Sequence, residues 1–339
     1  MGEPEGATPP RSLAPSANTA IPAAMIAIIG AGLAGLSAAR ALAAHGVPVR
    51  LFDKGRAPGG RLATRRAEQD GVRLQFDHGA QYLRAEGADF ATALAAAGAQ
   101  PWPDAARRVG VPGMSALPRA LAEGLDIVAS RHVGRVVGEP GAWRVQHWDA
   151  REAKPGAPLP ATPPVEDGPF SAVLVTVPAP QVLDLLPGYA AALGGVRYAP
   201  CWTVMASFET RLPLPDTLRP DGHAIGWAAR DSSKPGRDGG TECWVVQAGP
   251  GWTRAHLEDR AETIVAALLG ELAALAGAPL PSPRYAAAHR WRYSLLEASL
   301  GQPCLWDATQ RIGLAGDWCL AGRAEAAWDS GAALAAAVA

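Results

Sequence analysis

Small and apolar residues fill the chain from residue 21 to 39 without a single charge. Within this run, IAII at 26–29 predicts a buried strand of a parallel sheet. Residues 33–44 have the composition of a helix, and Gly46 is placed to end it. VPVRLFDK at 47–54 then predicts a second strand, so the pattern predicts a βαβ unit.

An uncharged run of this length is also long enough to be considered as a membrane span. Pro22 and three glycines within six residues interrupt the continuous helix that a span needs. We therefore interpret the run as part of a folded domain and expect no membrane association.

The three glycines form G-x-G-x-x-G in the turn between the first strand and the helix. Gly30 permits a tight turn, Gly32 lets the backbone approach a pyrophosphate, and Gly35 allows close helix–strand packing. The helix N-terminus would face the phosphates, and Asp53, after the second strand, would accept hydrogen bonds from an adenosine ribose. The unit therefore predicts a dinucleotide-binding site.

The next segment favours FAD over NAD as that dinucleotide. APGGRLATRR at 57–66 stands where an NAD-only Rossmann domain usually continues into another helix, and it resembles the continuation found in flavin amine oxidases. Gly59 and Gly60 would bring backbone N–H groups near the pyrophosphate, and Arg61 would add a charge-assisted hydrogen bond. The alternatives are a surface turn with solvated arginines and, for the chain as a whole, an NAD-only dehydrogenase.

The C-terminal segment, 311–338, predicts a short strand, a Gly-Asp turn and an alanine-rich helix that starts near Ala327. This order is similar to FAD proteins in which the aspartate, here Asp317 after Gly316, reaches the ribitol hydroxyls. The helix N-terminus would stabilise negative charge on the reduced flavin pyrimidine. A helix that only closes the core is the alternative, but it does not explain the Gly-Asp pair.

The middle of the chain predicts mostly strands. Residues 125–138 predict paired strands in which Val133 would offer its backbone to adenine, and 171–186 predict a buried strand that ends at Val177. Residues 196–250 predict strands separated by Pro/Gly turns. Residues 254–276 predict an amphipathic helix.

The chain has 339 residues, enough for one large domain or two intimately joined ones. Its formal net charge of −1 predicts no general attraction to nucleic acid or to an anionic membrane. The four cysteines, without C-x-x-C spacing, favour a reduced cytoplasmic setting over a zinc site or a disulfide framework. Residues 1–24, rich in Pro, Ala, Gly and Ser, predict a disordered tail and no signal peptide.

Together these segments resemble the renalase group, the small members of the flavin amine oxidase superfamily. The resemblance rests on GGRLATRR (59–66), DHGAQYL (77–83), VGVPGMSAL (109–117), WAARDSSKPGR (227–237), WVVQAGPGWTRAHLE (244–258), HRWRYS (289–294) and AGDW (315–318). It implies an α/β fold with a Rossmann-type FAD domain and a second domain on mixed or antiparallel sheet, as in p-hydroxybenzoate hydroxylase. We expect the discontinuous FAD domain to comprise 25–84, 112–190 and 308–339, and the substrate domain to comprise 85–111 and 191–307.

The resemblance also implies residue roles. It places Ala34 at the phosphates, Asp53 and Lys54 at the adenosine, Gly60 and Arg61 at the pyrophosphate, Gln81 and Tyr82 beside the flavin ring, and Asp317 at the ribitol. Gln247 is a departure, because relatives carry a histidine there, and the resemblance therefore supplies no role for it.

Renalases oxidise dihydropyridine isomers of NAD(P)H, reduced at ring position 2 or 6, by hydride transfer to flavin N5, and O2 is reduced to H2O2. The resemblance therefore implies non-covalent FAD, with a dihydropyridine nucleotide and O2 as small-molecule partners. Such a donor needs only to be held against the flavin, so we predict no catalytic acid or base and no metal. The seven histidines have no metal-ligand spacing, and His78 and His289 are interpreted as structural.

Lysine is rare, with Lys54, Lys154 and Lys234 as the only three. Amine oxidases of the larger superfamily usually carry a lysine that holds a water near flavin N5. Here Lys54 belongs to the predicted adenosine end, Lys154 to a Pro/Gly-rich loop, and Lys234 to a loop predicted to bind phosphate or close a rim. This distribution disfavours amine oxidation.

Aromatic side chains are candidates for the walls of a nicotinamide pocket. We predict Tyr82, Trp202, Trp227 and Trp291 there, and Trp244 is a further candidate. As a group, Arg61, Arg65, Arg66, Arg230 and Arg237 are predicted to guide the diphosphate of the substrate.

Two other functions remain open. The first is a small flavin amine oxidase or desaturase-like FAD oxidoreductase, and the second is an FAD-binding protein without turnover. The sequence also leaves open the preference between NAD and NADP isomers, the preference between 2- and 6-dihydro forms, and the oligomeric state.

Overall fold

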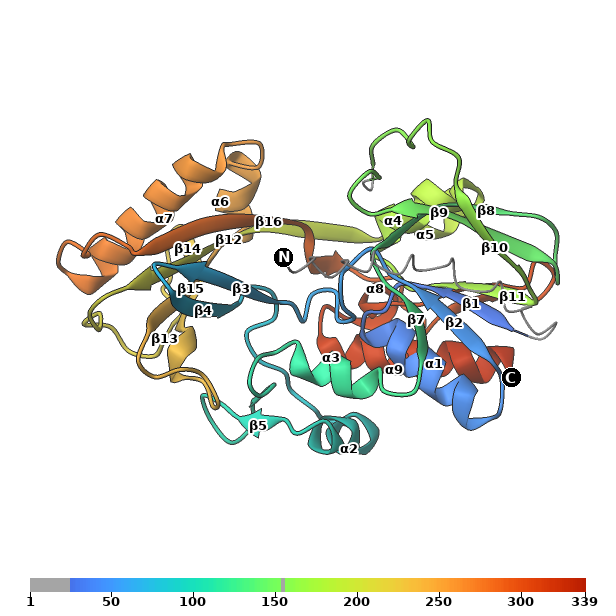
Figure 1. Ribbon diagram of the computed structural model, residues 1–339, viewed down its shortest axis with the longest axis horizontal. Helices are drawn as coiled ribbons and strands as arrows, with labels where there is room; N and C mark the ends of the chain where they lie inside the picture. Colours follow the sequence, from blue (N-terminus) through green and yellow to red (C-terminus); the bar gives the residue numbers. More distant parts are fainter. Residues whose placement is uncertain (1–24, 154–155) are drawn as a thin grey trace, which may run out of the picture.

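The structure is a computed structural model that describes residues 25–153 and 156–339. The predicted tail, residues 1–24, and Lys154 lie outside the described residues. Figure 1 shows two lobes, with the long strands β12 (Arg197–Phe208) and β16 (Tyr285–Ala298) running from one toward the other.

The first lobe contains a six-stranded sheet in the order β17-β18-β11-β1-β2-β7. All its strands are parallel except β17, which runs antiparallel to β18. The strands are β1 (Ile26–Ile29), β2 (Val49–Phe52), β7 (Asp126–Val128), β11 (Ala172–Val175), β18 (Ile312–Leu314) and β17 (Leu305–Asp307). The predicted βαβ unit is confirmed, with helix α1 spanning Leu33–Ala44.

Both faces at the centre of this sheet are buried, which explains the unbroken apolar strands β1, β11 and β18. Ile26 and Ile28 pack with α1 and α9 (Ala324–Val338), whereas Ala27 and Ile29 face a second apolar cluster. That cluster includes side chains of a three-stranded sheet in the order β10-β9-β8 and of α4. The strands of this sheet are β8 (Arg131–Val137), β9 (Trp143–Asp149) and β10 (Val165–Phe170). Helix α4 (Ala179–Leu185) is followed by the short helices η1 (Pro187–Tyr189) and α5 (Ala190–Leu193).

The second lobe contains a five-stranded antiparallel sheet in the order β13-β14-β15-β12-β16. Its other strands are β13 (Thr217–Leu218), β14 (Ile225–Arg230) and β15 (Glu242–Ala248), which confirms the predicted strands of 196–250. Helix α7 (Ala261–Ala276) buries its apolar stripe against this sheet, and the hairpin β3 (Thr64–Gln69) and β4 (Val72–Asp77) packs on Met205 and Val245. The fold is therefore the predicted α/β arrangement of a Rossmann-type sheet with a second, antiparallel sheet.

The segment 85–111 contacts both lobes. It comprises α2 (Ala88–Ala96), β5 (Gln100–Pro101) and β6 (Arg108–Val109), and it leads into α3 (Ala116–Leu121). Phe90 of α2 packs on Trp328 of α9, whereas Trp102 donates a hydrogen bond to Ser233 of the second lobe. The predicted limits of the two domains stay a prediction.

Two predicted elements differ from the structure. The helix predicted at 254–276 is broken, because α6 (Pro250–Ala255) ends before a polar stretch and Arg260 is extended ahead of α7. The strands predicted at 125–138 do not pair with each other: β7 joins the six-stranded sheet, and β8 pairs with β9. The turn between β7 and β8 bonds to the loop after β2 instead, through Ser130 N to the Gly55 carbonyl.

Candidate cofactor and substrate cleft

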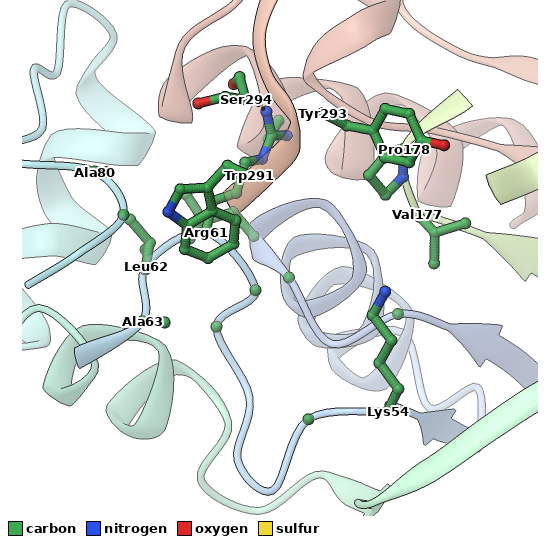
Figure 2. A pocket seen from close by; sticks show the side chains of 18 of the residues that line it. Lys54, Arg61, Leu62, Ala63, Ala80, Val177, Pro178, Trp291, Tyr293 and Ser294 are labelled. Carbon is green, nitrogen blue, oxygen red and sulfur yellow. Dashed lines mark hydrogen bonds between the residues drawn. The ribbon is translucent and has the colours of Figure 1, made fainter. Parts of the chain in front are cut away.

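A cleft of about 2280 Å³ lies between the lobes, and both ends of the described chain contribute to it. Figure 2 shows Lys54 on one side of it and Arg61 and Trp291 on another. Among the residues predicted to bind the cofactor, taken together with Tyr82, Trp202, Trp227 and Trp291, only Gly35 does not line the cleft. The others line it: Gly30, Gly32, Ala34, Asp53, Lys54, Gly60, Arg61, Gln81, Tyr82, Val133, Trp202, Trp227, Trp291, Gly316, Asp317 and Ala327.

The glycine turn before α1 has the geometry that its sequence predicts. Gly30 has φ +108°, a conformation that a side chain would strain. A Cβ on Gly35 would lie 1.9 Å from the Gly30 carbonyl oxygen, so the helix packs where only glycine fits. A Cβ on Gly32 would meet nothing within 4 Å, because this position opens to the cleft.

Asp53 holds the end of β2 against the glycine turn. Its Oδ2 accepts a hydrogen bond from Ala31 N at 2.7 Å, and its Oδ1 accepts one from Gly55 N at 2.6 Å. Lys54 lines the cleft beside it and donates to Gln181 Oε1 at 3.3 Å. The carboxylate is thereby fixed at the position where the sequence predicts the adenosine.

Arg61 connects the two ends of the chain. Its NH1 and NH2 donate to Asp317 Oδ2 and Oδ1 at 2.8 and 2.6 Å, and NH1 also donates to the Ser294 carbonyl at 3.1 Å. Burial alone would lower the pKa of Arg61, but the charge and hydrogen bonds of Asp317 outweigh it and raise the pKa. Tyr198 donates to Asp317 at 3.4 Å, and burial together with this carboxylate raises the pKa of its phenol.

The C-terminal helix begins earlier than predicted. After Gly316, Asp317 starts the short helix α8 (Asp317–Leu320), and α9 begins at Ala324. Ala327 lines the cleft, but its N–H already bonds to the Arg323 carbonyl at 3.4 Å, so the prediction of a start near Ala327 was wrong. Arg323 has an extended backbone, and the helix begins at the next residue.

These features fit a dinucleotide cofactor of the FAD type. Neither α1 nor α9 has a side-chain cap at its N-terminus, so the first N–H groups of each helix are available to an anion or carbonyl oxygen. The open position at Gly32 provides room for a pyrophosphate next to α1. Arg61 and Asp317 line the same cleft as a paired cation and anion.

Gln81 and Gln247 fix the loop 78–82 beside the cleft. Gln81 is buried, and its Nε2 donates to the carbonyls of Asp77 and Gly79. Gln247 Nε2 donates to the same Gly79 carbonyl at 2.8 Å. Gln247, which the resemblance left without a role, therefore joins β15 to this loop.

A buried ionic cluster lies behind this loop, and the sequence did not predict it. Lys234 Nζ lies 2.6 Å from Asp231 Oδ1 and 3.3 Å from Asp77 Oδ2, and Arg237 also pairs with Asp77. All four side chains are at most 3% exposed. Lys234 does not line the cleft, so its interpretation as a phosphate-binding or rim residue was wrong.

The pKa values of the two carboxylates of this cluster shift in opposite directions, although burial acts to raise both. Burial would raise the pKa of Asp77, but Lys234, Arg237 and the hydrogen bonds from Met114 N and Thr64 outweigh it and lower the pKa. Burial raises the pKa of Asp231, and the nearby charge of Asp77 adds to the rise.

Aromatic side chains form two groups in the cleft. Tyr82 and Trp227 meet edge to face with ring centroids 5.6 Å apart. His78, His289 and Trp291 form the second group, with centroids 4.4 to 5.2 Å apart. Burial, the neighbouring His289 and the charge of Arg65 lower the pKa of His78 to about 4, so this imidazole is neutral at pH 7.

The remaining aromatic candidates differ in position. Trp202 lines the cleft, and its Nε1 donates to the His256 carbonyl at 2.8 Å. Trp244 does not line it, because it is fully buried in the core of the second lobe and donates to Glu242.

The cleft is strongly basic although the chain carries a formal net charge of −1. Four acidic residues line it: Asp53, Glu86, Asp184 and Asp317. Twelve basic residues line it: Lys54, Arg56, Arg61, Arg65, Arg66, Arg84, Arg119, Arg131, Arg219, Arg290, Arg292 and Arg323. Of the five arginines predicted to guide a diphosphate, Arg230 and Arg237 do not line it, because both are held in ion pairs inside the second lobe.

Sequence comparison gives the family. The model of the flavin-containing amine oxidoreductase family matches residues 104–339, and that of an NAD(P)-binding Rossmann-like domain matches residues 28–96. The chain belongs to the flavin-containing amine oxidoreductase family. FAD is accordingly its cofactor, as the sequence predicted. Within the described residues, no helix is long and apolar enough to cross a membrane, and no cluster of side chains is suited to a metal ion.

Solved structures share the fold of this family member. An Exiguobacterium sp. 255-15 protein described as a protoporphyrinogen oxidase matches with a TM-score of 0.70 and 14% identity, over 94% of this chain and 99% of that one. Cyclohexylamine oxidase from Brevibacterium oxydans IH-35A gives 0.67 and 13%, over 94% and 99%. Putrescine oxidase bound to putrescine gives 0.62 and 15%, over 92% and 98%. At these identities the likeness concerns the fold alone.

Proposed function

We propose that this flavoprotein is a renalase-like oxidase, which converts dihydropyridine isomers of NAD(P), reduced at ring position 2 or 6, to NAD(P)⁺. O2 accepts the electrons and leaves as H2O2. The donor loses a hydride, which is two electrons and one proton, and the solvent supplies the second proton of the peroxide. The observation that carries the proposal is the charge of the cleft.

Twelve basic side chains against four acidic ones exceed what the two phosphates of FAD require. Arg65, Arg66, Arg84 and Arg219 are exposed in the cleft, and none has an ion pair with another described residue. Such a field attracts an anionic second ligand and repels a cationic one. A dinucleotide carries at least two phosphates, whereas amine substrates are positively charged in water, so the charge favours the dinucleotide.

The described lysines give a second reason against amine oxidation. Lys54 lies beside Asp53 at the loop after β2, and Lys234 is enclosed in the ionic cluster with Asp231. Figure 2 shows Lys54 apart from Trp291, one of the aromatic residues that would face a flat substrate, and Lys234 does not line the cleft. Within the described part of the chain, no lysine is therefore placed to hold a water there.

The residues of the cleft provide what a dihydropyridine donor requires. FAD, when bound, supplies the hydride-accepting ring and the reactivity toward O2. Gly32, Arg61 and Asp317 would hold it from both ends of the chain, while Tyr82 and Trp227 provide an aromatic, partly apolar wall. Loss of the hydride makes the donor ring aromatic, so no side chain needs to remove a proton from it.

The test is anaerobic mixing of the yellow protein with separated 2- and 6-dihydro isomers of NAD and NADP. We expect the flavin absorbance to bleach with at least one isomer and to recover with H2O2 release when O2 is admitted. The ordinary 4-dihydro form is the matched control and should bleach it far more slowly. Bleaching by putrescine, cyclohexylamine or protoporphyrinogen, with none by the dihydro isomers, would overturn the proposal in favour of another oxidase of this family. No bleaching by any of them would favour a protein that binds FAD without turnover.

A further inference from the structure

A cationic and aromatic row lies where the second lobe meets the loop 78–82 and the segment 85–111. The Arg219 guanidinium carbon lies 5.7 Å from the ring centroid of Trp227, and that ring meets Tyr82 edge to face. On the other side, the guanidinium carbon of Arg107 lies 4.8 Å from the ring centroid of Tyr82. Two guanidinium groups therefore flank a pair of aromatic rings along this row, at distances typical of cation–π contacts.

The two arginines of the row differ in what they can still bind. Arg107 pairs with Asp104, three residues before it, and does not line the cleft. Arg219 is exposed and lines the cleft, and no described residue forms an ion pair with it. The donors of Arg219 are thus available to a ligand, whereas those of Arg107 are partly used within the protein.

A guanidinium on an indole face is suited to phosphate recognition. The five N–H donors of the guanidinium form a planar fork that matches the oxygens of a phosphate. Contact with the ring already restricts the arginine side chain, so it loses less conformational freedom when a phosphate binds. The position is also separate from the FAD site in the fold. Arg219 belongs to the second lobe, whereas Gly32 and the N-terminus of α1 belong to the first.

We propose that Arg219 recognises the phosphate groups of the second dinucleotide, the substrate, and that Trp227 and Tyr82 hold its guanidinium in place. This inference rests on the proposed function, because it takes the substrate to be a dinucleotide. It assigns the nucleotide half of the substrate to the mouth of the cleft formed by Arg219, Trp227 and Tyr82.

The experiment measures binding to the FAD-loaded protein by calorimetry, with ADP-ribose and NADP⁺ as probes at low and at high ionic strength. ADP-ribose carries the nucleotide half without a nicotinamide, so its binding is independent of the redox reaction. Arg219→Gln should weaken both probes about tenfold, as expected for loss of a charge-assisted hydrogen bond, and should reduce the salt dependence of binding. Arg219→Lys, which keeps the charge without the fork, should recover only part of the affinity.

Arg197→Gln is the matched control. Arg197 is exposed at the start of β12, does not line the cleft and has no ion pair among the described residues, so this variant changes the net charge equally. It should change both affinities less than about twofold, since salt screens the charge of an exposed side chain that does not line the cleft. The flavin content of all variants should equal that of the wild type.

Each contrary outcome has a distinct meaning. If the wild type binds ADP-ribose and Arg219→Gln binds it equally well, the assignment of Arg219 is wrong and the proposed function stands. If Arg197→Gln weakens binding as much as Arg219→Gln, only long-range charge matters and the assignment is again wrong. If the wild type binds neither probe, the dinucleotide substrate itself is wrong, and the inference falls with it.

Discussion

Asp77→Asn changes the charge of a buried cluster that is neutral as it stands. Two carboxylates, Asp77 and Asp231, face one ammonium and one guanidinium, from Lys234 and Arg237. The asparagine would leave one positive charge without a partner in side-chain surroundings that are at most 3% exposed. The Oδ2 atom of Asp77 now accepts hydrogen bonds from both cations. The asparagine would present a neutral amide N–H₂ or carbonyl in its place.

The expected loss is large because burial of an uncompensated charge costs about 3–5 kcal/mol. One feature places the value near the lower end. Asp231 still lies 2.6 Å from Lys234 and 3.7 Å from Arg237, so one carboxylate remains paired with both cations. We therefore expect a loss of about 3 kcal/mol, which lowers the melting temperature by roughly 4–5 °C in a protein of this size.

The assay is urea unfolding followed by far-ultraviolet circular dichroism on FAD-loaded protein, with refolding checked on dilution. Asp231→Asn should lower the free energy of unfolding by less, about 1–2 kcal/mol, because burial raises the pKa of this carboxyl and so disfavours its charged form. Glu166→Gln is the surface control: it breaks a half-exposed pair with Arg144, which should cost less than about 1 kcal/mol. A loss for Asp231→Asn equal to or greater than that for Asp77→Asn would refute this reasoning.

The pH dependence of Asp77→Asn follows from the same contacts. The pKa of Asp77 is lower in the folded protein than in the unfolded chain. Its contribution to stability is therefore present above the unfolded pKa and is lost as the pH falls through the folded value. The variant should accordingly lose less stability than the wild type between neutral pH and strongly acidic pH.

Three further predictions concern the cleft. Gly32→Val should keep the fold, since a Cβ there meets nothing within 4 Å, but it should lower the flavin bound per purified chain. Gly35→Val should instead lower the melting temperature, since its Cβ would lie 1.9 Å from a backbone oxygen; the reverse pattern would contradict the geometry. Asp317→Ala should raise the FAD dissociation constant about tenfold, because Arg61 loses its bidentate partner, and a fluorescence titration with FAD that gives an unchanged constant would exclude this role. Because the pKa of His78 is lowered to about 4 in the folded protein, the free energy of unfolding should rise by about 3 kcal/mol between pH 4 and 6.5. His78→Asn should flatten this rise, and urea unfolding across that pH range checks it.

The parts of the fold that were predictable are those specified by neighbouring residues. One βαβ unit contains the strand Ile26–Ile29, the glycine turn and the helix Leu33–Ala44 in direct succession. The local pattern of apolar residues and glycines is therefore enough to predict them. The break between α6 and α7 was missed because the apolar spacing, which includes Leu257, continues through it, although the backbone leaves the helix at His256 and is extended at Arg260.

The parts of the site that were missed depend on distant pairs. Asp77 and Lys234 are separated by 157 residues, and no local pattern indicates that a lysine in a Pro/Gly turn is buried against an aspartate after a hairpin. The position of Arg219 over Trp227 likewise follows from the pairing of β13 with β14, which brings the two residues together. Such contacts require the register of the sheets, and a single sequence does not supply it.

The place of β18 inside the six-stranded sheet has a consequence for biosynthesis. This strand, Ile312–Leu314, lies between β11 and β17, and α9 after it packs on α1 from the other end of the chain. Until the final residues emerge from the ribosome, the edge of β11 and the apolar side of α1 have no partner. We expect the nascent chain to depend on chaperones at this stage, and a chain that stops before β18 to aggregate rather than accumulate as a colourless apoprotein.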